Sequence, residues 1–154
     1  MSIAVGAKAP ALTLPVSGGG ELSLAKLKGK PVVLYFYPKD DTSGCTREAH
    51  DFRDALARFK KAGAEVIGIS KDSVASHDKF KAKHRLPFPL LADTEGKACE
   101  AFGTWVEKSL YGRKYMGIER ATFVIDGKGA IRHIWRKVKV PGHVDEVLAA
   151  VQSL

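Results

Sequence analysis

Two adjoining stretches decide what this chain can be: Pro31-Val-Val-Leu-Tyr-Phe-Tyr37 and Pro38-Lys-Asp-Asp-Thr-Ser-Gly-Cys-Thr-Arg-Glu-Ala49. The first is a short apolar run of β-branched and aromatic residues, which predicts a buried strand. After it, apolar residues recur every three or four positions, which predicts a helix over about 43–62. Asp40 to Ser43 are of types favoured at helix N-termini. Cys45 is therefore expected in or just before the first helical turn.

That position makes Cys45 a candidate nucleophile. The first turn of a helix has backbone N–H groups without intrahelical partners, and the helix dipole there favours an anion. A thiolate is such an anion, and the thiolate is the reactive form of cysteine. The sequence therefore predicts that Cys45 reacts rather than only packs.

The spacing Pro38-x-x-x-Thr42-x-x-Cys45 resembles the peroxide-site motif of the peroxiredoxins. A second matching segment, Gly117 to Asp126, begins 72 residues after Cys45. It is similar to the strand that carries the active-site arginine of that family, which here is Arg120. The resemblance covers nearly the whole chain and is closest to the bacterioferritin-comigratory, or Q-type, branch. It implies a thiol-dependent peroxidase that reduces hydrogen peroxide and organic hydroperoxides through a Cys45 sulfenic acid, without a cofactor or metal.

The resemblance also implies roles for the residues around Cys45. Arg120 would stabilise the thiolate and the charge on the leaving oxygen. Glu48 would hold an arginine through a charge-assisted hydrogen bond, although a glutamate in a first helical turn is also favoured by the dipole. The Thr42 hydroxyl can bond the sulfur or the peroxide, or serve as a helix cap. Pro38 can shield the thiol or simply end the strand, and the Gly44 N–H can bind a peroxide oxygen.

The second thiol marks a departure from part of the family. A sulfenic acid needs another thiol for recycling. Many Q-type members resemble Cys-x-x-x-x-Cys, but His50 stands at the second cysteine position here. Cys99 is the only other thiol, and it is expected to pack beside Phe102 on a helix. We therefore expect a one-cysteine mechanism completed by an external thiol such as thioredoxin, glutaredoxin or glutathione.

Composition sets further bounds. The chain has 154 residues, 45% of them hydrophobic and 27% charged, which predicts one domain over 1–154. The longest apolar run is too short to cross a bilayer. Two cysteines and no visible secretory signal predict a reducing compartment, the cytoplasm. We also expect a monomer. A net charge of +8 is a feature of proteins that bind nucleic acid. No binding motif accompanies it, so we expect a solvated basic surface with neither nucleic acid nor membrane as partner.

The expected elements alternate between strand and helix patterns. They indicate an α/β, thioredoxin-like fold, with a central mixed sheet flanked by helices and an N-terminal β-hairpin extension. Segment 103–117 reads as loop-rich, and a short helix is expected over Thr94 to Phe102. His77 and His84 are expected to be solvated on a helix over 73–84. The other expected elements are strands at 12–14, 21–24, 31–37, 64–70, 90–91, 121–125 and 130–135, and a helix at 143–151.

Two other functions compete with the peroxidase. A thiol–disulfide oxidoreductase would need Cys-x-x-Cys, but Glu48 occupies the second cysteine position. A basic binding module, for nucleic acid or as a chaperone-like surface, would explain the charge and would leave the thiols inert to peroxide.

Overall fold

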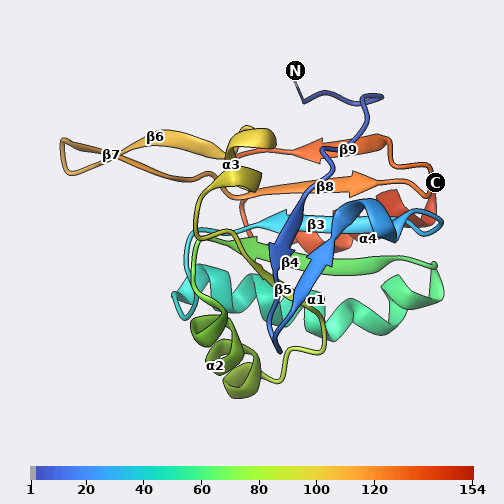
Figure 1. Cartoon of the computed structure of the whole chain (residues 1–154), viewed down its shortest axis with the longest axis horizontal. Helices are drawn as coiled ribbons and strands as arrows, with labels where there is room; N and C mark the ends of the chain where they lie inside the picture. Colours follow the sequence, from blue (N-terminus) through green and yellow to red (C-terminus); the bar gives the residue numbers. More distant parts are fainter. Residues whose placement is uncertain (1–2) are drawn as a thin grey trace.

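The computed structural model describes residues 3–154 and is built around one five-stranded sheet (Figure 1). Three parallel strands are followed across the sheet by two antiparallel ones, in the order β5-β4-β3-β8-β9. The predicted mixed sheet is confirmed. Its strands are β3 (Val32–Phe36), β4 (Glu65–Ser70), β5 (Leu90–Ala92), β8 (Ala121–Ile125) and β9 (Ile131–Trp135).

Four helices flank this sheet: α1 (Ser43–Lys61), α2 (Val74–His84), α3 (Lys97–Ala101) and α4 (His143–Gln152). Helix α1 connects the parallel strands β3 and β4, as expected for a βαβ unit. The helices α1 and α4 pack against each other behind the sheet in the view of Figure 1. The loop between β3 and α1 is the segment that carries the peroxiredoxin-like motif.

The two faces of β3 build two separate cores. All five residues of this strand are buried, and their side chains alternate between faces as strand geometry requires. Val33 and Tyr35 join the core that contains α1 and α4. Leu34 and Phe36 join the core on the opposite face, which contains Cys99 and Phe102. The sheet therefore separates the two cores.

The N-terminal segment covers the second core. Strands β1 (Thr13–Pro15) and β2 (Glu21–Ser23) pair antiparallel, which confirms the predicted hairpin. A 3-10 turn, η1 (Leu24–Leu27), follows directly, so the second strand ends one residue earlier than expected. This segment packs on the face of the sheet opposite to α1, through the side chains of Leu14, Leu22 and Leu24.

The expectation of a loop-rich segment over 103–117 is wrong. Strands β6 (Trp105–Leu110) and β7 (Arg113–Ile118) form a hairpin that extends away from the central sheet (Figure 1). Tyr111 and Gly112 form its two-residue turn and have φ angles of 51° and 77°. A turn with both central residues at positive φ matches the twist of the strands, but tyrosine is not a residue that signals it. The hairpin leads directly to Arg120.

Helix α3 is shorter than the expected Thr94–Phe102. It begins only at Lys97, because Gly96 adopts a left-handed conformation with φ of 76°. The carboxylate of Asp93 accepts hydrogen bonds from the N–H groups of Ala98 at 3.1 Å and Cys99 at 2.9 Å. This carboxylate, which lies outside the helix, satisfies the N–H groups of the first turn.

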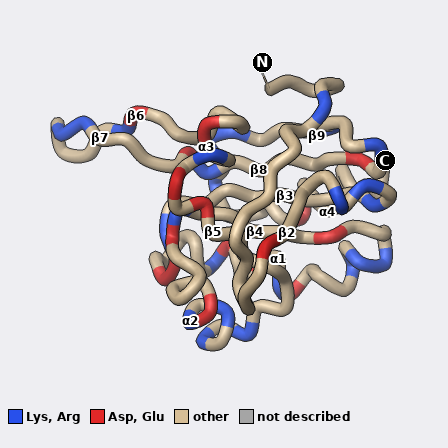
Figure 2. Tube along the Cα trace, viewed as in Figure 1, with Lys and Arg blue, Asp and Glu red and all other residues tan. Residues whose placement is uncertain are grey.

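The basic residues lie at several separate places along the chain (Figure 2). They occur near the end of α1, along α2 and at the tip of the β6–β7 hairpin. Strand β9 is an edge strand, as the mixed basic and apolar sequence near Arg132 predicts. No helix within residues 3–154 has the length and apolar character needed to span a bilayer. That the basic surface binds no nucleic acid stays a prediction.

Gly68 in β4 offers a test of how tightly the core around β3 is packed. A Cβ atom at this position would lie 2.7 Å from Leu90 Cδ2 and 2.9 Å from Tyr35 Cζ, and both side chains are fully buried. We expect Gly68→Ala to lower the free energy of unfolding by about 1–3 kcal/mol, because these side chains have no free space to move into. Urea unfolding measures it, and an unchanged midpoint would show that the core can adjust.

Candidate active site

Cys45 lies in the first turn of α1 and is buried, with 1% of its surface exposed. Thr42 is the N-cap residue, and its carbonyl accepts the first bond of the helix, from the N–H of Thr46 at 2.8 Å. The N–H groups of residues 43–45 therefore precede the hydrogen-bonded part of the helix. This is the environment that the sequence predicted for Cys45.

Arg120 lies beside Cys45 although 75 residues separate them. Its Nη2 donates to Cys45 Sγ at 3.4 Å, and its Nη1 donates to Glu48 Oε1 at 2.7 Å. Sheet register causes this meeting. Phe36, the last residue of β3, pairs with Ala121, the first residue of β8, so the residue before β8 lies beside the loop after β3.

Glu48 is fully buried and lies one helical turn after Cys45. Burial raises the pKa of its carboxyl to about 7, against the lowering effect of Arg120. For Arg120, burial lowers the pKa, but the negative charges of Glu48 and Cys45 outweigh it and the net shift is upward. Glu48 thus fixes the guanidinium that contacts the sulfur, and its position agrees with the role expected from the sequence.

Thr42 and Pro38 lie on the same loop, but neither side chain is bonded to the sulfur. The Thr42 hydroxyl donates to the Lys39 carbonyl at 2.9 Å and is exposed. Pro38 is half-buried directly after the strand. The structure therefore shows Thr42 capping through its backbone, with its hydroxyl at the solvent side of the loop.

Gly44 is in close contact with the arginine. A Cβ atom on Gly44 would lie 3.2 Å from Arg120 Nη2. The missing side chain lets the guanidinium approach the start of the helix, next to the N–H groups that precede its hydrogen-bonded part. This close approach is a feature that only the folded chain displays.

His143 and Thr122 are neighbours of the site that sequence reasoning missed. Thr122 Oγ1 and His143 Nε2 are hydrogen-bonded at 2.8 Å, and both residues are buried. Burial lowers the pKa of His143 to about 4, and the charge of Arg120 adds to this shift. The imidazole is therefore neutral at physiological pH. No local motif marks the contact, because it joins α4 to β8.

The expectation that His77 is a solvated helix residue is wrong. His77 is completely buried, and its two ring nitrogens bond to Asp40 and to the Leu91 carbonyl. His84 is also largely covered, with 15% of its side chain exposed, and its Nδ1 lies 2.9 Å from Nε2 of His50. The prediction was wrong because the lysines form the solvated face of α2, whereas these two histidines lie on its inward face.

Cys99 is fully buried in the core on the opposite face of the sheet from Cys45. Burial raises its pKa to about 12, and the adjacent Asp93 carboxylate contributes. Cys99 is therefore a protonated thiol at neutral pH. Phe102 belongs to the same core, as the sequence predicted.

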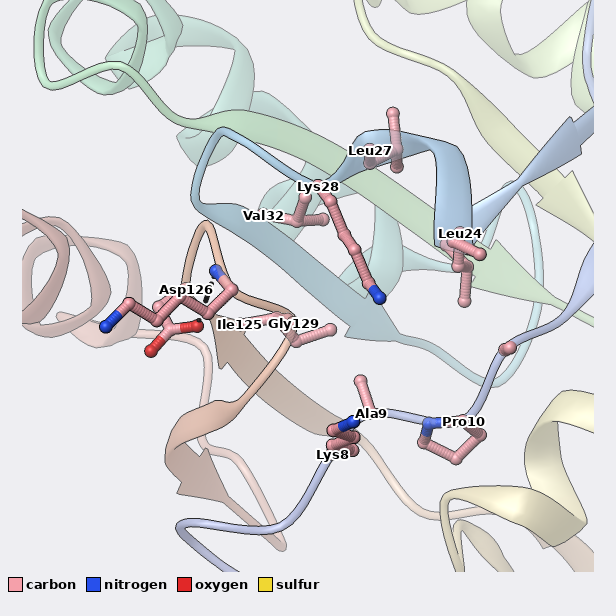
Figure 3. Close-up of a pocket in the computed structure, with 13 residues that line it drawn as sticks. Lys8, Ala9, Pro10, Leu24, Leu27, Lys28, Val32, Ile125, Asp126 and Gly129 are labelled. Carbon is pink, nitrogen blue, oxygen red and sulfur yellow. Dashed lines mark hydrogen bonds between the residues drawn. The ribbon is translucent and has the colours of Figure 1, made fainter.

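A cavity of about 150 Å³ lies away from this site (Figure 3). It is lined by Val32, Ile125, Leu24 and other apolar residues, with Lys8 and Lys28 at its side. Val32 pairs with Ile125 at the end of β3 opposite to the Phe36–Ala121 pair. None of the residues around Cys45 lines the cavity, so it is not the place where the thiol chemistry occurs.

A thiol at a helix N-terminus, held against a fixed arginine on a sheet flanked by helices, is the arrangement of an enzyme that uses a cysteine thiolate. Residues 5–134 match the model of the AhpC/TSA family. The chain belongs to this family, in its Bcp and peroxiredoxin Q branch, and is a thiol-dependent peroxidase.

The similar proteins cover essentially the whole chain. A Coxiella burnetii relative is 58% identical over 148 residues, which are 96% of this chain and 98% of that protein. Peroxiredoxin Bcp of Bacillus subtilis is 51% identical over 154 residues, which are 100% of this chain and 98% of that protein. A solved structure of the Xanthomonas campestris bacterioferritin comigratory protein, 48% identical, superposes with a TM-score of 0.89 over 92% of this chain and 90% of that one.

The raised pKa of Glu48 predicts a pH-dependent stability. Between pH 4.5, its ordinary value, and about 7, folded Glu48 keeps a proton that the unfolded chain releases. The Glu48 contribution to the free energy of unfolding is therefore complete below pH 4.5. It is lost as pH rises to about 7, and its size is on the order of a few kcal/mol. Urea unfolding of wild type and Glu48→Gln at several pH values tests this. Parallel pH curves for the two proteins would contradict it.

Proposed function

We propose that the Cys45 thiolate is the group that attacks the peroxide. Its sulfur bonds to one peroxide oxygen, the O–O bond breaks, and the other oxygen leaves as water or an alcohol after taking a proton. Cys45 is then a sulfenic acid. The observation that carries this proposal is the 3.4 Å contact between Cys45 Sγ and Arg120, whose guanidinium is fixed by Glu48. A fixed cation stabilises both the thiolate and the charge on the leaving oxygen.

The loop before α1 supplies the remaining groups in this proposal. The N–H groups of Gly44 and Cys45 would bind the peroxide oxygens, as helix N-termini bind anions. The Thr42 hydroxyl, now on the Lys39 carbonyl, would turn to the incoming peroxide. Pro38 would keep bulk water from the sulfur. The substrates would be hydrogen peroxide and organic hydroperoxides; the Xanthomonas relative is described by its alkyl peroxide reduction activity.

The oxidised enzyme would be recycled by a thiol from outside the chain. His50 occupies the place of a nearby second cysteine, and Cys99 belongs to the core on the other face of the sheet. Thioredoxin, glutaredoxin or glutathione would therefore supply the electrons. We further propose a monomer made of a single domain over 1–154, working in a reducing compartment such as the cytoplasm, where free thiols persist.

Removing the charge of Arg120 tests the proposed site. We expect Arg120→Met to slow the reaction of Cys45 with peroxide by roughly 10²-fold or more, on the scale of losing one fixed donor. Alkylation of Cys45 should also be slower, because the cation that stabilises the thiolate is lost. Stopped-flow rates and a pH titration of alkylation are the measurements. Cys45→Ser is the reference variant and should show no peroxide turnover.

Two results would overturn this assignment. Turnover within tenfold of wild type in Cys45→Ser would exclude Cys45 as the nucleophile. An unchanged rate and alkylation profile in Arg120→Met would show that the arginine does not act on the sulfur.

The separation of the two thiols gives a prediction about recycling. Disulfide formation needs Cα atoms within about 7 Å, and a Cys45–Cys99 bond would require disrupting two cores. We expect oxidised protein to hold Cys45 as a sulfenic acid or mixed disulfide, and Cys99→Ser to keep most turnover with a small thiol or glutaredoxin. Non-reducing peptide mapping after one equivalent of peroxide checks this. A dominant Cys45–Cys99 peptide would instead establish a two-cysteine enzyme.

A further inference from the structure

A buried polar cluster lies behind the loop that carries Pro38 and Thr42. His77 of α2 is 0% exposed, and Asp40 of the loop is 7% exposed. His77 Nδ1 lies 2.8 Å from Asp40 Oδ2, and its Nε2 lies 2.8 Å from the Leu91 carbonyl oxygen. Neither contact involves the sulfur, and the mechanism above does not use them.

The hydrogen-bond partners of His77 bear on the charge of its imidazole. A neutral imidazole donates from one nitrogen only, whereas the nearest atom to each His77 nitrogen is an oxygen, of Asp40 or of the Leu91 carbonyl. The Tyr37 hydroxyl lies farther from Nδ1, at 3.4 Å, and donates to Asp40. A neutral ring can therefore satisfy both oxygens only if the Asp40 carboxyl keeps a proton for Nδ1. Asp40 also accepts from the Tyr37 and Ser76 hydroxyls, as an ionised carboxylate can. The arrangement fits an imidazolium bonded to a carboxylate.

This pair fixes the loop from two sides. The Asp40 side chain is bonded to α2 through His77 and Ser76, while its main-chain N–H donates to Asp72 Oδ2 at 2.8 Å. Asp72 lies just after β4 and also accepts from the Ser70 hydroxyl at 2.6 Å. The next residue, Asp41, has a φ of 64°, a left-handed conformation that needs support in a residue other than glycine.

We propose that the buried His77–Asp40 ion pair is a positioning device for the peroxide reaction, holding the Pro38–Thr42 loop in register with the Cys45 sulfur. His77 and Asp40 are positioning residues, because neither contacts the reacting atoms. The inference rests on the proposed role of Cys45. Its consequence is that loss of the imidazolium leaves the Asp40 charge buried without its cation, so the loop shifts while the start of α1 stays formed.

The titratable groups that face His77 come from three elements. Asp40 belongs to the loop, Tyr37 follows β3, and Asp72, which reaches the pair through the Asp40 N–H, follows β4. Burial raises the pKa of Tyr37 well above its usual range, so this phenol stays neutral and donates. The carboxylates are thus the groups that balance the imidazolium.

A metal ion is the competing explanation for the same residues. Ligand atoms of Asp40, Asp72 and His77 lie within 4.8 Å of one another. However, His77 has bonds at both nitrogens, and Asp72 accepts from the Asp40 N–H and the Ser70 hydroxyl. A cation would have to break these bonds, so the geometry favours the ion pair.

His77→Gln tests the proposal, with Lys79→Gln as its matched control. Lys79 is an exposed residue of the same helix, and its replacement also removes one positive charge. We expect His77→Gln to slow the reaction of Cys45 with hydrogen peroxide by about tenfold to hundredfold, because small misplacements cost that much. Alkylation by iodoacetamide, which needs the sulfur but not the loop, should change less than about threefold. Lys79→Gln should match wild type in both reactions.

Equal slowing of the peroxide and alkylation reactions in His77→Gln, or no slowing of either, would overturn the proposal. A measurement on wild type keeps it testable if the variant does not fold: nitrogen-15 NMR of the active protein should show a proton on each of the two His77 ring nitrogens. One unprotonated nitrogen would also overturn it. Failure of wild-type Cys45 to react with peroxide would instead contradict the proposed function, and the NMR result would still decide the charge of His77.

Discussion

The ion pair between Glu48 and Arg120 is the interaction on which the site depends. It joins helix α1 to the residue before β8 through a 2.7 Å hydrogen bond, and the Glu48 carboxylate is fully buried. Arg120 donates to a carboxyl oxygen that burial shields from solvent, and a buried acceptor without its donor is destabilising, so each residue fixes the position of the other. The arginine that reaches the sulfur is therefore held by the packing of the whole fold.

The register of the central sheet makes that ion pair possible. Because β3 and β8 run antiparallel with Phe36 opposite Ala121, the end of one strand and the start of the other meet at the same edge. The loop before α1 lies at this edge, with Asp40 bonded to α2 and to the end of β4. Cys45 thus gains a helix N-terminus and a cation from segments that only strand pairing brings together.

The two cysteines show how far environment decides chemistry. Cys45 has an arginine donor and the start of a helix beside it. Cys99 has burial and the Asp93 carboxylate, which raise its pKa to about 12. The sheet lies between them because alternate residues of β3 point into different cores. The fold therefore places the two thiols in different environments on opposite faces of the sheet.

The sequence by itself determined the order and type of most elements, because the apolar periods of β3 and α1 and the cap residues between them are local signals. It also placed Cys45 at a helix start, and the motif around Arg120 indicated the arginine that the structure brings to the sulfur. The β6–β7 hairpin was missed because Tyr111 is an uncommon residue for its turn, and α3 was shortened by the conformation of Gly96. Tertiary structure alone decided that the side chains of His77 and Glu48 are buried, and that Cys99 lies in the core on the opposite face of the sheet from Cys45. Those properties depend on which segments pack together, and the local pattern around a polar residue does not specify its distant neighbours.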